Sequence, residues 1–306
     1  MSQEIIVFDR VQQKTIKEVI YGRFFVELLY GKSLISFFFR LILLPVLTCG
    51  PLFSRLYGLF QSSRLSRYKI APFIKKFHIN TQEFLHPVHS FTSFNEFFIR
   101  KLKPAARPIT PGNHIAILPA DGRYLVYPNA EQADGFVVKG KKFSLQELLG
   151  STTSAAPYQK GAVIIARLCP TDYHRFHFPC DCLPSEAIPI LGPLHSVNPM
   201  AITRNPSLLS QNKRSVTLLQ TRAFGQIAFI EIGAICVGAI HQTYQPFQPY
   251  HKGEEKGFFS FGGSSLIALF EEDTLELEKD LILHSSQHRE ILGLLGQPLG
   301  CAKNRS

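Results

Sequence analysis

The chain has 306 residues, of which 45% are hydrophobic, and it carries a formal net charge of +10 at neutral pH. This size and apolar content allow one large buried core, alone or with an appended element. Its six cysteines are too few for a disulfide-scaffold protein and favour a reducing compartment, and the N-terminus, Met-Ser-Gln-Glu, does not resemble a signal peptide.

The net positive charge of the chain comes entirely from its N-terminal third. Residues 1–110 hold 16 Lys and Arg against 6 Asp and Glu, whereas the remainder holds 17 of each kind. This third contains an apolar, aromatic segment, 34–53, in which Arg40 is the only charged residue. Six basic residues follow it: Arg55, Arg64, Arg67, Lys69, Lys75 and Lys76. Basic side chains beside an apolar face suit an anionic membrane surface.

Segment 34–53 favours an interfacial helical anchor over a membrane-spanning helix or a helix buried in the fold. A mid-segment arginine costs roughly 2.5–3.5 kcal/mol at a bilayer centre, and Pro45 and Gly50-Pro51 break the helix. Nucleic acid also attracts basic charge, but no recognisable nucleic-acid-binding motif accompanies it. We therefore expect residues 1–110 to form a helical, basic, membrane-associating region.

The local patterns divide the chain into a helical part and a β-rich part. Residues 11–80 are predicted to be helical, with short breaks, and 84–92 to be a connector. From Ile115 onward short strands alternate with turns, and two short helices interrupt them. The predicted strands are 115–118, 123–127, 162–167, 215–220, 226–232 and 265–270, and the predicted helices are 144–150 and 285–296. The expected fold class is α+β, with a β-rich catalytic domain at 111–306.

A Gly262-Gly263-Ser264-Ser265 turn stands between an aromatic stretch and an apolar run. Two glycines let the backbone take conformations closed to other residues, and they leave the Gly263 carbonyl unshielded by any side chain. The hydroxyl of Ser264 can reach that same carbonyl. Taken alone, the tetrapeptide is most simply a turn between two strands.

Two upstream segments supply acid–base groups for such a hydroxyl. His174 and His177 lie three residues apart in an aromatic-rich, Pro-bounded segment, which places two imidazoles in one small region. Asp121 lies in a Pro-Ala-Asp-Gly turn after a predicted strand. Asp121, His177 and Ser264 thus provide the orienting acid, the base and the nucleophile of hydroxyl activation.

Further motifs accompany these segments in a fixed order: residues 94–104 (FNEFFIRKLKP), 107–109 (RPI), 139–140 (KG), 196–199 (SVNP) and 252–255 (KGEE). With them, the chain from about Phe94 to the C-terminus resembles the pyruvoyl-dependent phosphatidylserine decarboxylase proenzymes. Many members of that family carry Leu-Gly-Ser-Thr where this chain has Gly-Gly-Ser-Ser. Both forms keep the reacting Gly-Ser bond.

The resemblance implies that the chain cleaves itself between Gly263 and Ser264 into a large chain, 1–263, and a small chain, 264–306. Ser264 then becomes a covalent pyruvoyl cofactor, which forms a Schiff base with the substrate. In this scheme His177, oriented by Asp121, is the base of self-cleavage. His174 acts in the later decarboxylation.

The implied reaction converts phosphatidylserine to phosphatidylethanolamine and carbon dioxide in phospholipid biosynthesis. The expected partners are phosphatidylserine in a membrane and the large and small chains with each other. A homo-oligomer is compatible with the sequence, whereas nucleic acid and a metal ion are not expected. We expect a peripheral location on the cytoplasmic face of the cell membrane.

The sequence allows three other interpretations of its function. A serine hydrolase would use Asp121, His177 and Ser264 in an order that known triads also use, but no Gly-x-Ser-x-Gly elbow surrounds the serine. A metal site would use the two histidines with Cys180 and Cys182, although in an extended segment residues three apart point to opposite faces. A structural membrane protein would explain only the N-terminal third.

Three further polar residues are not assigned to the site. Glu231, inside a predicted strand, is expected at a solvent-facing position. Asn198 and Lys252 could contact a lipid head group, but each is equally well explained as a turn or surface residue.

Overall fold

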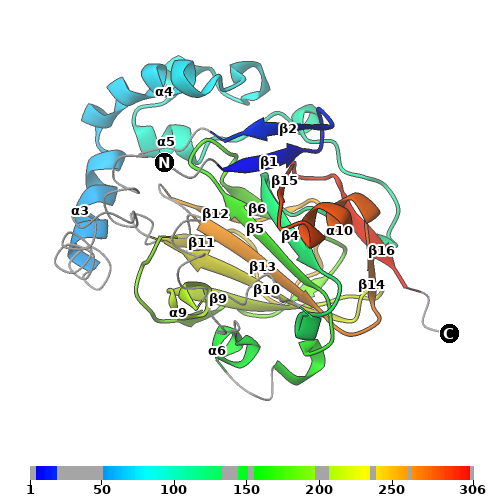
Figure 1. Cartoon of the computed structure of the whole chain (residues 1–306). Coiled ribbons are helices and arrows are strands. Elements are labelled where there is room, and N and C mark those ends of the chain that lie inside the picture. Colours follow the sequence, from blue (N-terminus) through cyan, green and yellow to red (C-terminus); the bar gives the residue numbers. More distant parts are fainter. Residues whose placement is uncertain are drawn as a thin grey trace, which may run out of the picture.

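The computed structural model describes residues 5–18, 51–132, 144–150, 155–196, 207–234, 239–260 and 264–303. Within these residues the chain has an α+β fold dominated by β-sheets, with short helices at the periphery (Figure 1). The predicted β-rich α+β class is therefore confirmed. Residues 34–50 of the predicted anchor, including Phe37, Phe38 and Phe39, lie outside the described residues, as do Gly262 and Gly263.

The largest sheet has ten strands in the order β2-β1-β15-β4-β5-β13-β10-β9-β7, with β8 also paired to β9. β1 and β15 run parallel, and all other neighbours are antiparallel. The strands are β1 (Ile6–Asp9), β2 (Lys14–Lys17), β4 (Gly122–Tyr127), β5 (Val163–Leu168), β7 (Leu183–Pro184), β8 (Ile188–Ile190), β9 (Arg214–Gln220), β10 (Gln226–Gly233), β13 (Ser264–Phe270) and β15 (Glu290–Gly293).

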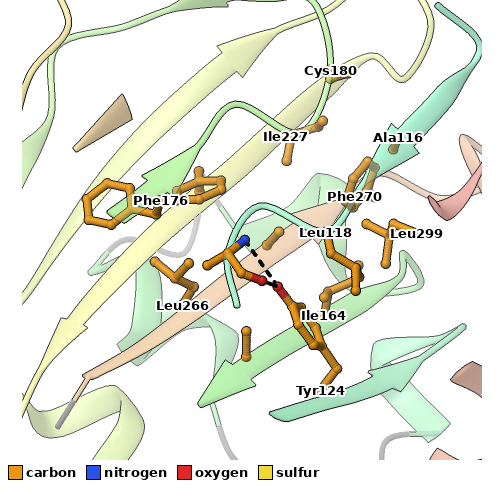
Figure 2. Close-up of a cluster of buried hydrophobic side chains, with 14 of the residues drawn as sticks. Ala116, Leu118, Tyr124, Ile164, Phe176, Cys180, Ile227, Leu266, Phe270 and Leu299 are labelled. Carbon is orange, nitrogen blue, oxygen red and sulfur yellow. Dashed lines mark hydrogen bonds between the residues drawn. The ribbon is translucent and has the colours of Figure 1, made fainter. Parts of the chain in front are cut away.

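Strand β13 lies inside this sheet, between β5 and β10, and all of its residues are buried. A strand covered on both faces reads as a continuous apolar run. Accordingly, Leu266 and Phe270 pack into one hydrophobic cluster, and Ile267 packs into a second cluster. Figure 2 shows the first cluster, which includes Tyr124 of β4. The Tyr124 hydroxyl donates to the carbonyl of Ala120 (2.6 Å) and so holds the turn before β4.

Two three-stranded sheets complete the β structure of the described residues. Phe176 and Phe259 of the first small sheet belong to the same cluster as Leu266, so this sheet packs against one face of the ten-stranded sheet. The first small sheet comprises β11 (Ile240–Gln242), β12 (Glu255–Phe259) and β6 (Arg175–His177), in that order, and the second comprises β14 (Leu275–Leu277), β16 (Pro298–Ala302) and β3 (Ile115–Ile117).

The helices are short. The α-helices are α3 (Pro51–Ser62), α4 (Ile70–Phe77), α5 (Phe94–Phe98), α6 (Leu145–Leu149), α9 (Leu208–Gln211) and α10 (Lys279–Ser286). The 3₁₀ helices are η1 (Arg64–Lys69), η2 (Thr81–Glu83), η3 (Val88–Ser90), η4 (Pro104–Ala106), η5 (Ala130–Gln132) and η7 (Ala156–Tyr158). In Figure 1, α3 and α4 lie outside the sheets on one flank, with α5 below α4.

The helices α4 and α5 are held by a phenylalanine cluster. The buried members of this cluster are Ile70, Phe73, Phe84, Phe91, Phe94, Phe97 and Phe98. Helix α5 begins at Phe94 because the Ser93 side chain accepts the N–H of Glu96, which satisfies a donor that the helix leaves free. The phenylalanine spacing in this part of the sequence therefore serves a core of its own.

Most of the predicted elements are confirmed, and two helical predictions are wrong. The predicted strands correspond to β3, β4, β5, β9, β10 and β13, and the predicted helix at 144–150 corresponds to α6. Residues 14–17, expected in a helix, instead form β2. The predicted helix 285–296 also fails, because α10 ends at Ser286 and β15 follows at Glu290–Gly293, where Ile291 is buried in the sheet.

The predicted helical N-terminal region is present only in part. Helices α3 and α4 lie within 51–80 as expected. In the part of the chain that the structure describes, no helix is both long enough and apolar enough to cross a bilayer.

Candidate active site

Ser264 is the first residue of β13 and lies opposite Leu168 of β5 on one side and Gly233 of β10 on the other. The side chain is fully buried, and its Oγ atom has no hydrogen-bond partner among the described residues. A buried hydroxyl without a partner is costly and needs an explanation, and the Oγ of the neighbouring Ser265 shares this property.

Asp121 lies directly before β4, at the same end of the sheet as Ser264. The register pairs Arg123 of β4 with Arg167 of β5, one residue before the Leu168 that faces Ser264. The start of β4, the end of β5 and the start of β13 therefore lie side by side. Asp121 itself is only 3% exposed.

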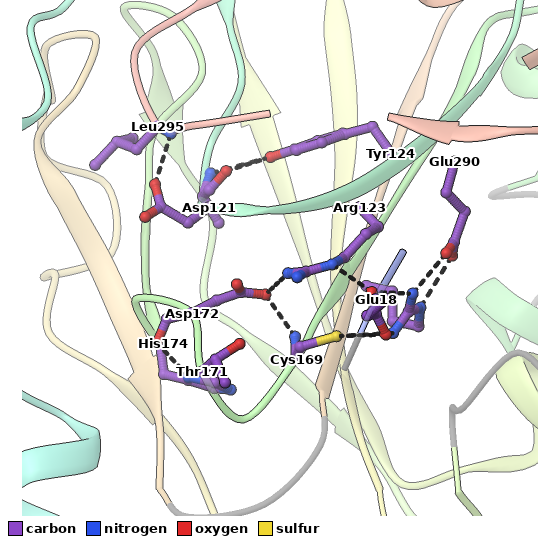
Figure 3. A network of polar contacts seen from close by, with 12 residues as sticks. Glu18, Asp121, Arg123, Tyr124, Cys169, Thr171, Asp172, His174, Glu290 and Leu295 are labelled. Atoms are coloured by element: carbon purple, nitrogen blue, oxygen red, sulfur yellow. Dashed lines mark hydrogen bonds and ion pairs between the residues drawn. The ribbon is translucent and has the colours of Figure 1, made fainter. Parts of the chain in front are cut away.

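The carboxylate of Asp121 is held by Arg107. Arg107 donates from Nε to both carboxylate oxygens (2.9 and 3.0 Å) and from Nη2 to Oδ2 (2.7 Å). The backbone N–H of Leu295 donates to Oδ1 at 2.9 Å, as Figure 3 shows. No hydrogen bond joins Asp121 to His177 within the described residues, so the triad contact expected from the sequence is absent in this arrangement.

His177 ends β6 and lies beside the turn that carries Asp121. Its backbone N–H donates to the carbonyl of Pro119 (2.8 Å), two residues before Asp121. The ring is buried, and Nδ1 has no partner among the described residues. Burial lowers the pKa of His177 to about 4, although the charge of Asp121 opposes this shift. The imidazole is therefore neutral at physiological pH.

His174 lies in the loop between β5 and β6 and is fully buried. Its ring packs on Phe98, with 3.8 Å between ring centroids. Nδ1 is 3.1 Å from the carbonyl oxygen of Asp172 (Figure 3). Because a carbonyl only accepts, Nδ1 carries the proton. Burial lowers the pKa of His174 to about 3, so the ring is neutral, and Nε2, which has no partner among the described residues, carries a free lone pair.

A buried network of charges holds the loop that carries His174 (Figure 3). The Asp172 carboxylate accepts from Arg123 and from the backbone N–H of Cys169. Arg123 faces Arg167 directly across the two strands, which on its own would be repulsive. Glu18 resolves this repulsion by accepting from both arginines (2.7 and 3.1 Å).

The contacts within this network keep the Glu18 carboxylate charged. Burial by itself would raise the pKa of Glu18, but Arg167 and Arg123 outweigh it and lower the pKa to about 2. Glu290 accepts from Arg167 at 2.5 Å and completes the set. The sequence analysis missed this network, although two arginines inside predicted strands were a visible signal.

The interpretation of Glu231 as solvent-facing is wrong. Glu231 is fully buried and lies 2.5 Å from Nζ of Lys256, which is also fully buried. The β-rich part is covered on both faces of its main sheet, so an alternating pattern there does not identify a wet face. Lys252 instead donates to the carbonyls of Gly112 and Ile115, and Asn198 lies outside the described residues.

His174 also lies beside the strand that leads into Ser264. The backbone N–H of Phe259, the last residue of β12, donates to the carbonyl of His174 at 3.0 Å. Four residues connect Phe259 to Ser264, so the two Cα atoms are five steps apart and at most about 18 Å from each other. The structure thus gathers Asp121, His174, His177 and Ser264 at adjoining strand ends.

Cys180 and Cys182 are buried free thiols. Nowhere in the described residues do three or more His, Cys, Asp or Glu side chains group as metal ligands.

Buried acid–base groups near a buried serine hydroxyl make this arrangement a candidate active site. The sequence model for phosphatidylserine decarboxylase matches residues 94–289. A phosphatidylserine decarboxylase proenzyme of Chlamydia pneumoniae is 46% identical over 296 residues, which cover 95% of each chain. Proteins of the same name from Chlamydia muridarum and Chlamydia caviae are 43% and 48% identical, covering 98% and 83% of this chain and 98% and 85% of their own. The chain therefore belongs to the phosphatidylserine decarboxylase family.

Proposed function

We propose that the chain decarboxylates phosphatidylserine to phosphatidylethanolamine and carbon dioxide, using a pyruvoyl group that it makes from Ser264. The observation that carries this proposal is the buried Oγ of Ser264, which has no hydrogen-bond partner among the described residues and stands at the start of an interior strand, directly after Gly263. The Oγ of Ser265 is likewise buried without a partner among the described residues, but Ser264 is the serine that directly follows Gly263.

The proposed self-cleavage uses atoms of the chain alone. Ser264 Oγ attacks the Gly263 carbonyl, and the amide nitrogen of residue 264 leaves, which converts the peptide bond to an ester. Elimination across Cα and Cβ of residue 264 then releases Gly263 as a carboxylate. Addition of water and loss of ammonia leave a ketone carbonyl at position 264.

His177 is the proposed base for this self-cleavage. Its low pKa keeps the ring neutral, so a nitrogen lone pair is available to take the hydroxyl proton. Asp121 lies beside it through the turn at Pro119, where its negative charge favours the protonated ring that forms. We assign Asp121 an electrostatic role, because its hydrogen bonds go to Arg107 and Leu295.

His174 is the proposed acid–base group of decarboxylation. Its Nδ1 proton is fixed on the Asp172 carbonyl, so Nε2 is the atom that can accept and return a proton. The pyruvoyl group, when formed, supplies a carbonyl that condenses with the substrate amine and accepts the electrons left by carbon dioxide. Buried surroundings exclude water from the carbanion-like carbon until His174 delivers the proton.

The N-terminal helices support peripheral attachment to a membrane. Leu59 of α3 and Leu65 and Tyr68 of η1 are each more than half exposed. Exposed basic residues accompany them, namely Arg64, Arg67, Lys75 and Lys76. Apolar side chains that enter the interface beside cations that contact anionic head groups form a membrane-docking surface. We propose that this surface brings the active site to its lipid substrate.

An intact-mass measurement on purified protein tests the proposed function. We expect two chains, 1–263 and 264–306, with the small chain lighter than simple hydrolysis predicts by the mass of one ammonia. The Ser264→Ala variant should remain one inactive chain. A fully active protein that is uncleaved, or whose small chain begins with ordinary serine, would refute the proposal.

A further inference from the structure

Three side chains from one segment of the N-terminal third contact the candidate active site. This segment runs from Phe94 to Arg107 and includes α5 and η4. We propose that it is the positioning element of the site, in which Arg107 sets the Asp121 carboxylate and Arg100 sets the loop that carries His174. The proposal rests on the function proposed above and adds residues that have no role in it.

Arg107 fixes the orientation of Asp121 by a forked contact. The guanidinium places two of its nitrogens on the carboxylate, and Nη1 donates to Glu83 at 2.9 Å. The side chains of Arg107 and Asp121 are 12% and 5% exposed. A planar fork matched to a carboxylate fixes the carboxylate plane, which a lysine ammonium cannot do. Together with the Leu295 N–H, this contact leaves Asp121 little freedom to rotate.

Arg100 holds the His174 loop through backbone carbonyls. Its Nη2 atom donates to the carbonyls of Thr171 and Asp172, both at 3.2 Å. The Asp172 carbonyl is the same acceptor that fixes the Nδ1 proton of His174. Arg100 therefore acts on the oxygen that decides which nitrogen of His174 is free.

Arg100 is also an unusual cation. It is 5% exposed, and no carboxylate among the described residues forms an ion pair with it. Its guanidinium lies over the rings of Phe84 and Phe97 (5.0 and 4.9 Å), which stabilise it in part. Burial lowers the pKa of Arg100 to about 10, so it stays charged at neutral pH. The charges of Asp121 and Asp172 offset part of the cost of burying this cation, and packing alone does not explain the rest.

Phe98 completes the element. Phe98 stands two residues before Arg100 in the sequence, and its ring packs on the ring of His174. Phe98 belongs to the phenylalanine cluster, so this contact anchors the imidazole to the core beneath the N-terminal helices. A purely structural role for the segment would stabilise the fold but would not change the proton affinity of His174.

The first test measures self-cleavage of Arg107 variants by the appearance of the small chain in freshly made protein. Arg107→Met should slow cleavage about tenfold to a hundredfold, because misplacement of a catalytic group by a fraction of an ångström is enough for such losses. The cleavage rate of Arg107→Lys should lie between those of the wild-type chain and Arg107→Met. The matched control is Arg10→Met, which removes a similar fork on Asp280 (2.7 and 3.0 Å) outside the site.

Cleavage of Arg107→Met at the wild-type rate would overturn this arm of the proposal. An equal slowing in Arg10→Met would do the same, because the effect would then follow lost stability. If the wild-type chain itself stays uncleaved, the proposed function fails. If the wild-type chain cleaves and the variants match it, only the positioning proposal fails.

The second test measures the pH dependence of decarboxylation by processed Arg100 variants. The charged groups that act on His174 are Arg100, from the segment after α5, and Arg123, from β4, and both lower its pKa. Loss of the Arg100 charge in Arg100→Met should raise that pKa and move the acidic limb of the rate profile to higher pH. Arg100→Lys keeps the charge, so its limb should stay in place while the rate falls.

The control for this test is Arg214→Met. Arg214 is also buried, and among the described residues it donates only to backbone carbonyls, those of Glu147, Leu148 and Asn212. Its loss should leave the acidic limb unchanged. A wild-type rate and limb in both Arg100 variants would overturn the proposal. Should Arg100→Met fail to fold, the reduced rate of Arg100→Lys still decides the question.

Discussion

Nζ of Lys256 lies 2.5 Å from Oε1 of Glu231, and neither side chain is exposed. The ammonium also donates to Thr217 and Gln242, both at 2.9 Å, so its three donors are satisfied. Burial lowers the pKa of Lys256 and raises that of Glu231, and the attraction between the two opposes both shifts. The pair connects β12, next to the His177 strand, to β10, next to the Ser264 strand.

The two partners of this pair should behave differently when removed singly and together. Glu231→Leu or Lys256→Met alone leaves a buried charge without its partner, which should cost about 3–5 kcal/mol of unfolding free energy. The double variant removes both charges and should recover most of that loss. Denaturant unfolding of the four proteins tests this. Additive losses in the double variant would show that the pair contributes stability that packing cannot replace.

The two histidines of the site should separate by phenotype. His177→Ala should block self-cleavage, because an unactivated serine hydroxyl is a weak nucleophile. His174→Ala should still be cleaved but should decarboxylate poorly. Gel analysis of cleavage and release of carbon dioxide measure the two steps separately. The reverse pattern would exchange the roles of the two residues.

Folding stability should depend on pH through the same two rings. The pKa values of His174 and His177 are about 3 and about 4 in the folded protein, below the ordinary value of 6.5. At a pH between the folded value and 6.5, the unfolded chain therefore binds more protons than the folded chain. Stability should therefore be complete above about pH 6.5 and fall as the pH drops, by about 1.4 kcal/mol per pH unit for each ring. Denaturant unfolding at pH 7, 6 and 5 measures this slope.

The double variant His174→Gln, His177→Gln should flatten this dependence. The exposed His89 provides a control, since its replacement by glutamine should leave the slope as it is. A wild-type slope in the double variant would assign the acid sensitivity to other groups.

Membrane binding should depend on the exposed apolar residues of the N-terminal helices. Replacing Leu59, Leu65 and Tyr68 by serine should weaken binding to anionic vesicles, while self-cleavage continues. Salt should weaken binding of the native protein, because it screens the attraction between basic residues and anionic lipid. Replacing Phe37, Phe38 and Phe39 by serine should act in the same direction.

The control for membrane binding is Leu283 of α10, which is also more than half exposed but lies on another element. Its replacement by serine should leave vesicle binding unchanged. Equal losses from Leu283 and from the helix variants would point to a general effect on the fold. Resistance of the native protein to alkaline extraction would instead favour a spanning segment.

The sequence predicted the strands well because the interior ones carry long apolar runs bounded by turns, as β5 and β13 do. It failed at β2, where Lys14–Lys17 is mostly exposed and takes its conformation from pairing with β1. β15 has a similar origin, since it forms between β1 and β4, elements far away along the chain. Local patterns carry no record of such pairings.

For the candidate site, the sequence predicted residues but not their contacts. Asp121, His174, His177 and Ser264 lie at adjoining strand ends, and their roles stay predictions. The Arg107 contact to Asp121 was missed, because whether two charged side chains meet depends on the path of the loop between them. Glu231 was misplaced for a related reason, since alternation along a strand does not reveal a second layer above it.

The proposed small chain, 264–306, has strands within the main sheet, and their position constrains when the proposed self-cleavage can take place. Its strand β13 is bonded on both sides, to β5 and β10, and its strand β15 lies between β1 and β4. Strands of both fragments therefore pair within the main sheet, and neither fragment can leave without breaking that pairing. A chain cut before it folds would have to form this sheet from two separate fragments. Self-cleavage that takes place only after the native site has formed avoids that difficulty. Only folded protein is then cleaved.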